Sequence, residues 1–231
     1  QMRVTEIIDH TPGVRELIIE AETPNEFHFK AGQFVTLHVP QEPKPALRAY
    51  SIASDDRNIN GFRLLFKFVE NGVASKFIWS LKGKELLQFT GPFGRIFFRE
   101  PPSQQIVFLN TGTGLSQHYS YLISKKDQFP NVKYRLLFGV RTEKDIYYQK
   151  ELDTLVSELK DFKYEYILSR PSEAWKGRKG YIQHFISDFD YKNIDTTFYL
   201  CGNGGMIKEV KEQLIEKDGF DKTKIFSEAF D

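Results

Sequence analysis

The chain of 231 residues contains a single cysteine, Cys201. One thiol excludes an internal disulfide framework, an all-cysteine iron–sulfur cluster and a cysteine-rich zinc site within one chain. The five histidines are scattered along the sequence, and no pair has the spacing typical of metal ligands. The sequence therefore predicts no metal site built from its own side chains.

Long apolar runs and an excess of one charge are also missing. No segment approaches the length of a membrane span, and residues 1–20 do not read as a signal peptide. The 32 Lys and Arg residues nearly balance the 31 Asp and Glu residues, so the overall charge does not favour nucleic acid or an anionic membrane as a partner. We therefore expect a cytoplasmic, reducing location.

The periodicity of the sequence changes near residue 101. Before it, short β-like segments are separated by turn signals such as TPG, NING and GPFG, which indicates an antiparallel barrel or sandwich. The exception is GVASKFIWSL at 72–81, which predicts a short helix. Pro101 and Pro102 mark a domain boundary. We expect an antiparallel β-barrel domain at 1–101 and a second domain at 102–231.

After that boundary, apolar strand-like segments alternate with amphipathic helical segments. This order predicts an α/β domain with a parallel sheet covered on both faces. Its strand-like segments are IVFLN, YRLLFGV, KYEYIL, TFYLC and the closing KIFSEAF. Ligands bind at the carboxyl ends of the strands in such sheets. Four segments follow those ends and become the candidate binding loops: NTGTG, GVR, LSR and CGNGG.

Two of these loops are rich in glycine. In TGTGLSQ, residues 111–117, two glycines between a strand and a helix let the backbone approach a pyrophosphate, although such turns also serve packing. In CGNGGM, residues 201–206, the thiol can touch a reacting ring or can be an inert core group. Neither loop alone decides between binding and packing.

Hydroxyl and basic residues mark three further segments. RAYSIAS, residues 48–54, sets Arg48 and Tyr50 among small residues, as a surface for a flat, charged ligand would. In the loop at 168–183, Ser169 and Arg170 can bind a phosphate monoester and Tyr181 can stack on adenine, or the loop is simply a solvated basic one. Ser75 in GVAS is either an ordinary helix cap or an anion ligand.

RAYS, GVAS, TGTG, SR…YIQ and CG occur in this order, and together the chain resembles the ferredoxin–NADP reductase family over essentially its full length. The resemblance implies an FAD-binding barrel followed by an NADP-binding domain. It places Arg48 at the flavin pyrophosphate, Tyr50 against the isoalloxazine ring, and Ser51 near the nitrogen that accepts hydride. By the same resemblance, Ser75 helps to hold the flavin phosphates.

In the second domain, the resemblance assigns the pyrophosphate loop to Gly112, Thr113 and Gly114, and a Cys-Gly pair near the nicotinamide to Cys201 and Gly202. The ending SEAF resembles family endings with an acidic residue two positions before an aromatic one. Glu228 would then handle protons or position a reactant, and Phe230 would cover the flavin, with Phe226 as an alternative. The chain departs from the family pattern at Asn110, Gln117 and Asp231.

The resemblance implies hydride transfer between NADP(H) and FAD at Ser51, Cys201 and Glu228, with electrons passing to or from a ferredoxin or flavodoxin. NADP is favoured over NAD because basic and hydroxyl residues can serve a ribose phosphate, although NAD is possible; these residues are Arg141, Ser169, Arg170 and Arg178. FAD is favoured over FMN on family grounds. A partner with an acidic surface would need a basic patch, for which the candidates are Lys76, Arg95 and Arg99.

Four other functions stay open at this point. The chain can be an NAD(P)H-dependent flavin reductase or the reductase component of an oxygenase. It can instead be a flavin-binding electron-transfer subunit that needs a partner for turnover, or an interaction module that has kept only the fold. Retention of Arg48, Tyr50, Ser51, Cys201 and Glu228 together argues against the last of these, since function belongs to sites and not to folds.

Overall fold

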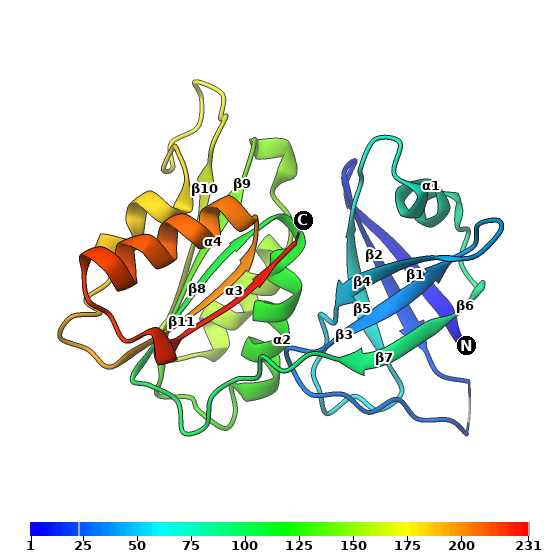
Figure 1. The fold of residues 1–231 in the computed structure, drawn as a ribbon, viewed down its shortest axis with the longest axis horizontal. Helices are drawn as coiled ribbons and strands as arrows, with labels where there is room; N and C mark the ends of the chain where they lie inside the picture. The colour runs from blue at the N-terminus through cyan, green and yellow to red at the C-terminus, as the bar shows by residue number, and fades with distance from the viewer. Residues whose placement is uncertain (23, 231) are drawn as a thin grey trace.

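The computed structural model describes residues 1–22 and 24–230, so that Asp231, one of the departures from the family pattern, lies outside the described residues. Figure 1 shows two lobes, one built from antiparallel strands and the other from a parallel sheet with helices. The chain passes from the first lobe to the second after β7 (Phe89–Phe93), through a segment that runs along the bottom of the view.

The first lobe contains two antiparallel sheets. The four-stranded sheet has the order β5-β2-β1-β6, from Gly61–Lys67, Val14–Glu20, Met2–Thr11 and Leu86–Leu87; the three-stranded sheet has the order β4-β3-β7, from Ala46–Ser51, Phe34–Val39 and Phe89–Phe93. A bridge between Ile52 and Leu64 joins the sheets on one side. Only Gln88 separates β6 from β7 on the other side. The predicted antiparallel barrel is confirmed.

Alternation of side chains explains how this lobe closes around a core. In β3, Val35, Leu37 and Val39 are buried while the residues between them are partly exposed, the period of two expected for a strand with one buried face. The helix predicted at 72–81 forms as α1 (Val73–Ser80) and contacts β3, β4 and β5. Its Ile78 belongs to the same core as the buried residues of β3.

The second lobe is built on a five-stranded parallel sheet. Its strands are β8 (Gln105–Thr111), β9 (Lys133–Val140), β10 (Phe162–Leu168), β11 (Thr196–Gly202) and β12 (Ile225–Ala229), in the order β10-β9-β8-β11-β12. Buried side chains occupy nearly every position of β8 and every position of β11. Continuous burial is typical of strands covered on both faces, and the predicted parallel sheet is confirmed.

Helices cover the two faces of this sheet. Alternate residues of β8 separate into two apolar clusters, one with α2 (Leu115–Lys125) and α3 (Gln149–Glu158), the other with α4 (Gly204–Lys211) and a 3₁₀ helix (Ile182–Asp188). A π-helical segment (Glu212–Lys217) continues α4. Short 3₁₀ turns occupy Gly112–Gly114, Glu143–Asp145 and Lys222–Lys224. Within the described residues, no helix has both the length and the apolar character needed to cross a bilayer.

The strand order reverses between β8 and β11, so the loops that follow these two strands are neighbours. The backbone N–H of Asn203 donates a hydrogen bond to Thr111 Oγ1, 2.8 Å away. Ligands of open α/β sheets bind at such a reversal point, outside the carboxyl ends of the strands. The barrel lies beside this edge, because the Ser120 hydroxyl on α2 donates to the Ser54 carbonyl of the barrel at 2.6 Å.

Candidate functional site

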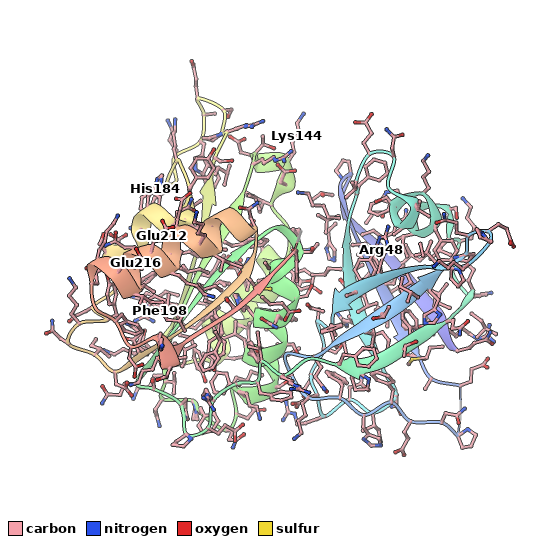
Figure 2. The ribbon with its side chains drawn as sticks, in the orientation of Figure 1. Arg48, Lys144, His184, Phe198, Glu212 and Glu216 are labelled. Carbon is pink, nitrogen blue, oxygen red and sulfur yellow. The ribbon has the colours of Figure 1, made fainter. Side chains whose placement is uncertain are left out.

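The end of β4 presents an arginine, a tyrosine and a serine. Arg48 is exposed, its guanidinium donates to the Leu47 carbonyl at 2.8 Å, and it makes no ion pair with any described residue. The Tyr50 ring packs on Phe66 with 4.4 Å between centroids, and burial raises the pKa of Tyr50 to about 12 against the opposing charge of Arg48. Figure 2 shows Arg48 on the barrel lobe, at β4.

The buried hydroxyl of Ser51 tests whether these residues fit a flavin. Ser51 is 5% exposed, and its Oγ has no hydrogen-bond partner among the described residues. A buried polar group without a partner costs about 1–3 kcal/mol, so such groups in native proteins call for an explanation. A ligand that offers a ring nitrogen beside Ser51, a flat surface to Tyr50 and a pyrophosphate to Arg48 satisfies all three. The residues at the end of β4 therefore fit FAD.

Ser75 has a structural partner. It is buried in the first turn of α1, and the backbone N–H of Val69 donates to its Oγ at 2.8 Å. This bond holds the turn that precedes α1. The N-cap residue of the helix, Gly72, has no side chain that could cap it. The hydroxyl proton of Ser75 is left for a second bond. A contact with the flavin phosphates stays a prediction.

The glycines after β8 and β11 allow these two loops to approach each other. A Cβ atom at Gly114 would overlap the Cys201 carbonyl, and one at Gly202, which has φ +124°, would overlap Thr111. Packing alone therefore requires glycine at 114 and 202. Gly112 has φ +53° and an open flank, so its backbone is accessible to a ligand. Thr113 is the central residue of the 3₁₀ turn Gly112–Gly114.

Lys67 was not predicted from the sequence. It ends β5 in the barrel, is exposed, and its Cδ would lie 4.0 Å from a Cβ atom on Gly112. Its ammonium makes no ion pair within the described part of the chain. A free cation beside the turn at 112–114 suits a pyrophosphate. A lysine at the end of a strand resembles any surface charge in sequence, which is why no signal marked it.

Cys201 and Glu228 lie opposite each other at the ends of two neighbouring strands. They pair in register in the parallel β11–β12 ladder. Cys201 is fully buried, and burial together with the nearby Glu228 carboxylate raises the pKa of its thiol well above the usual range. The thiol is therefore protonated at neutral pH, and no nucleophilic role is open to it. Burial also raises the pKa of Glu228, while a hydrogen bond from Gln117 opposes the rise.

Gln117 connects this pair with the barrel. Its Nε2 donates to Glu228 Oε2 at 2.6 Å and to the Gly32 carbonyl at 3.3 Å. The segment that begins at Gly32 leads directly into β3, where Phe34 pairs with Ser51. Gln117 thus links Glu228, which pairs with Cys201, to the barrel segment next to the strand pair that contains Ser51. That Ser51, Cys201 and Glu228 act together stays a prediction. Sequence analysis noted Gln117 only as a departure from the family pattern.

The two C-terminal aromatic residues differ in their surroundings. Phe226 stacks on Tyr199 with 5.2 Å between centroids, and the Arg99 guanidinium lies over the Phe226 ring, 5.0 Å from its centroid. Phe226 therefore packs against neighbouring side chains at the sheet edge. Phe230 lies just beyond β12, with its backbone N–H bonded to the Gly202 carbonyl at 2.8 Å. Phe230 stays the first candidate to cover a flavin, and the exposed Arg99 stays a candidate for a basic patch.

The candidate ribose-phosphate loop follows β9 and β10. Backbone bonds join the two strand ends, from Ser169 N–H to the Val140 carbonyl at 3.1 Å and from Arg170 N–H to the Arg141 carbonyl at 2.8 Å. The side chains of Arg141 and Arg170 are exposed, and neither forms an ion pair with a described residue. The structure thus brings Arg141 and Arg170, both unpaired among the described residues, to the carboxyl ends of two neighbouring strands.

Arg178 is engaged elsewhere. Its guanidinium bonds Asp188, lies 3.2 Å from Glu165, and covers the Phe185 ring at 4.9 Å. The bond to Asp188 raises the pKa of Arg178 further. Two carboxylates neutralise this cation, so a role in binding phosphate stays a prediction that would need these pairs to open. Tyr181 is 55% exposed and lies edge to face with His184, which Figure 2 labels on the second lobe, so stacking on adenine stays a prediction.

Comparison with known families and proteins agrees with this geometry. Residues 1–98 match an oxidoreductase FAD-binding domain, and residues 108–212 match an oxidoreductase NAD-binding domain. The chain is 31% identical over 239 residues to a ferredoxin–NADP reductase B of Sorangium cellulosum, covering 100% of this chain and 97% of that protein.

Other relatives are longer than this chain. A glycine betaine monooxygenase reductase subunit of Pseudomonas aeruginosa is 30% identical over 237 residues, covering 99% of this chain and 63% of the relative. The anthranilate 1,2-dioxygenase electron transfer component of Acinetobacter baylyi is 30% identical over 226 residues, covering 97% and 64% respectively. The chain thus spans slightly less than two thirds of these oxygenase-linked relatives.

Solved structures share the fold at lower identity. A cytochrome P450 reductase of Amycolatopsis superposes with a TM-score of 0.89 at 23% identity, covering 99% of this chain and 68% of that one. A ferredoxin NADP+ reductase of Neisseria gonorrhoeae, solved with FAD and NADP, gives 0.79 at 20% identity, covering 99% and 97%. With its barrel, its parallel sheet and these relatives, the chain belongs to the ferredoxin–NADP reductase family of NAD(P)H-dependent flavin oxidoreductases.

Proposed function

We propose that the protein transfers hydride between NADP(H) and FAD and passes electrons to or from a ferredoxin- or flavodoxin-type protein. The observation that carries this proposal is the arrangement of Ser51, Gln117 and Glu228 at the contact between the domains. The Ser51 hydroxyl, which has no partner among the described residues, would serve the flavin, and the carboxyl group held by Gln117 would serve the nicotinamide. An interaction module that had kept only the fold would have no reason to retain both.

The residues of the chain divide the work of the reaction. When bound, FAD accepts hydride as a pair of electrons and can release the electrons singly. Tyr50 offers one aromatic face for alignment, and the Ser51 hydroxyl can hydrogen-bond the reacting edge of the ring. The Cys201 thiol, protonated and buried, contributes an apolar wall at the nicotinamide side. Phe230 would exclude water from the opposite face of the flavin, and Glu228 would orient the nicotinamide or hold a proton.

Dinucleotide binding would use both domains. The accessible backbone at Gly112 and the Lys67 ammonium suit the pyrophosphate. The exposed side chains of Arg141 and Arg170 suit a ribose phosphate, which supports NADP over NAD. Because Arg178 is already paired with Asp188 and Glu165, the preference rests on those two arginines and Ser169.

A second candidate is the reductase component of an oxygenase. Relatives with printed names of this kind align over nearly the whole of this chain, among them the glycine betaine monooxygenase reductase subunit. The flavin chemistry is the same in both proposals, and only the electron acceptor differs. A separate electron-transfer protein with an acidic surface would meet Lys76 and Arg95 on the barrel.

An anaerobic visible spectrum of the purified, FAD-loaded protein tests the proposal. Flavin bands that bleach rapidly with NADPH and slowly with NADH are the expected result. Equal bleaching by both nucleotides would remove the NADP preference and leave the reductase. A protein that binds neither FAD nor FMN would overturn the proposal. A protein that binds flavin and is reduced only when a partner protein is present would be the non-catalytic electron-transfer subunit.

A further inference from the structure

Gln117 uses its side-chain amide on two partners that belong to different domains. The residue is 1% exposed on α2, in the second lobe. A primary amide carries two N–H donors, and Nε2 points them at Glu228 Oε2 (2.6 Å) and at the Gly32 carbonyl of the barrel (3.3 Å). A buried amide is stable only when such partners are present. The amide therefore fixes the distance between the Glu228 carboxyl group and the segment that leads to Ser51.

The same face of α2 carries other cross-domain bonds. Ser120 donates to the Ser54 carbonyl at 2.6 Å, Tyr121 donates to the Ile96 carbonyl at 2.6 Å, and Ser124 Oγ accepts from the Asp56 N–H at 3.0 Å. With Gln117 they occupy positions i, i+3, i+4 and i+7, which form one face of a helix. Four side chains thus hold α2 on the barrel. Gln117 differs from the other three because it also reaches Glu228.

We infer that Gln117 is a positioning residue, which holds the carboxyl group of Glu228 at a set place relative to the flavin domain so that the reaction depends on correct contact between the domains. This inference rests on the proposed function, and it extends it to a residue where the chain departs from the family pattern. Gln117 touches Glu228 and not the reacting atoms, so its effect on the reaction is indirect.

The surroundings of Glu228 leave Gln117 as its main polar contact. Cys201 faces it from β11 and Tyr121 from α2, and both are neutral at pH 7 because burial raises their pKa values. Glu228 has no cationic partner within residues 1–22 and 24–230. Burial raises the pKa of Glu228 and the bond from Gln117 lowers it. Removing that bond is therefore expected to raise the pKa of this carboxyl group.

The first test needs no cofactor. The Glu228 side-chain carbon is followed by ¹³C NMR against pH in the FAD-free protein, for wild type and Gln117→Met, which keeps the length of the side chain and removes its donors. We expect Glu228 to titrate at higher pH in Gln117→Met. Ser120→Ala is the matched control, because it loses one cross-domain bond on the same helix without touching Glu228. An unchanged titration in Gln117→Met would overturn the inference.

The second test measures flavin reduction by stopped flow. Gln117→Met is expected to slow reduction by roughly ten- to a hundredfold, the scale of a displaced catalytic group, with nucleotide affinity changed less than about twofold. Ser120→Ala loses one domain contact but leaves the bond to Glu228, so it should slow reduction far less than Gln117→Met. In a Glu228→Gln background, Gln117→Met should have little further effect. Equal slowing in both backgrounds, or a normal rate despite a shifted titration, would overturn the positioning role.

Misfolding of Gln117→Met and failure of the proposed function can each be distinguished from failure of the inference. If Gln117→Met does not fold, Gln117→Asn retains an amide but is one methylene too short to reach Glu228, and the same results are expected of it. If FAD-loaded wild type is reduced by neither NADPH nor NADH, the proposed function fails. The NMR titration still decides then whether Gln117 holds the carboxyl group.

Discussion

The two halves of the proposed site differ in how their polar groups are bonded: the end of β4, proposed for the flavin, and the ends of β8, β11 and β12, proposed for the nicotinamide. On the flavin side, Ser51 Oγ has no partner among the described residues and Arg48 is exposed. On the nicotinamide side, Gln117 bonds Glu228, and the loops after β8 and β11 interlock at Gly202. Substitutions on the first side should change cofactor binding and chemistry. Those on the second should first change the stability and alignment of the protein.

Gly202→Ala should have the largest effect, a loss of stability at the proposed nicotinamide side. Its φ of +124° is strained for any side chain, and the added Cβ would overlap the Thr111 backbone. We expect a loss of about 3 kcal/mol in the free energy of unfolding, measured by urea denaturation without cofactor. Gly13→Ala is the control, because nothing lies within 4 Å of its Cβ position. A variant as stable as wild type would contradict the interlocking of the two loops.

Buried His118 should make the stability of the protein sensitive to acid. It is fully buried on α2, its Nδ1 lies 3.2 Å from Asn110 Oδ1, and burial lowers the pKa of His118 to about 3. The unfolded chain takes up this proton near pH 6.5 and the folded protein only near pH 3. Between these values the unfolded state binds more protons, so stability that is complete above pH 6.5 is lost as the pH falls.

From pH 7 to pH 5 this single group should lower the free energy of unfolding by about 2 kcal/mol. The measurement is urea denaturation at the two pH values for wild type and His118→Phe. The two proteins differ in this one titratable group, so the difference between the two pH dependences isolates His118. Identical pH dependences would mean that His118 accepts its proton in the folded state.

Arg48→Met tests the flavin side. Loss of a charge-assisted bond to the flavin pyrophosphate, worth about 2 kcal/mol, should raise the Kd for FAD roughly thirtyfold. The free energy of unfolding without cofactor should stay within about 0.5 kcal/mol of wild type, because Arg48 is exposed and unpaired among the described residues. Lys44→Met removes a charge from the same hairpin and is the control. Equal weakening by both variants would show a general charge effect.

Local patterns in the sequence predicted most of the fold. Continuous apolar strands such as β8 predicted the parallel sheet, and alternating strands such as β3 predicted the barrel. The strand β1 was missed, since charged residues and two register shifts interrupt its alternation. The helical segment expected between the strand-like segments KYEYIL and TFYLC forms as a 3₁₀ helix, Ile182–Asp188. The helix α3 begins at Gln149, because the left-handed backbone of Tyr148, with φ +61°, interrupts the helix before it.

The site was predictable only where it is local. RAYS carries its chemistry in four consecutive residues, so its composition alone suggested a ligand surface. The bonds of Gln117 span 85 and 111 residues, and no spacing rule links positions so far apart. The packing of Gly114 against Cys201 depends in the same way on the assembled sheet. Motifs predict which residue types a site uses, while tertiary structure decides which of them are free.

Ser51→Ala should have the smallest effect on stability among these substitutions. Its hydroxyl has no partner in the described part of the protein, so its removal should leave the cofactor-free protein as stable as wild type or slightly more so. Ser54→Ala is the contrast, because Ser54 Oγ accepts from the Arg63 N–H at 2.7 Å and its loss should destabilise the fold by about 1 kcal/mol.

In the FAD-loaded protein, Ser51→Ala should slow flavin reduction about tenfold while changing the Kd for FAD less than about threefold. Rapid-reaction absorbance and a flavin-binding titration supply the two values. Unchanged reduction kinetics would remove Ser51 from the reacting edge of the ring. A destabilised cofactor-free protein would instead mean that its hydroxyl has a structural partner, and the contrast between the two sides would then fail at the residue on which it depends most.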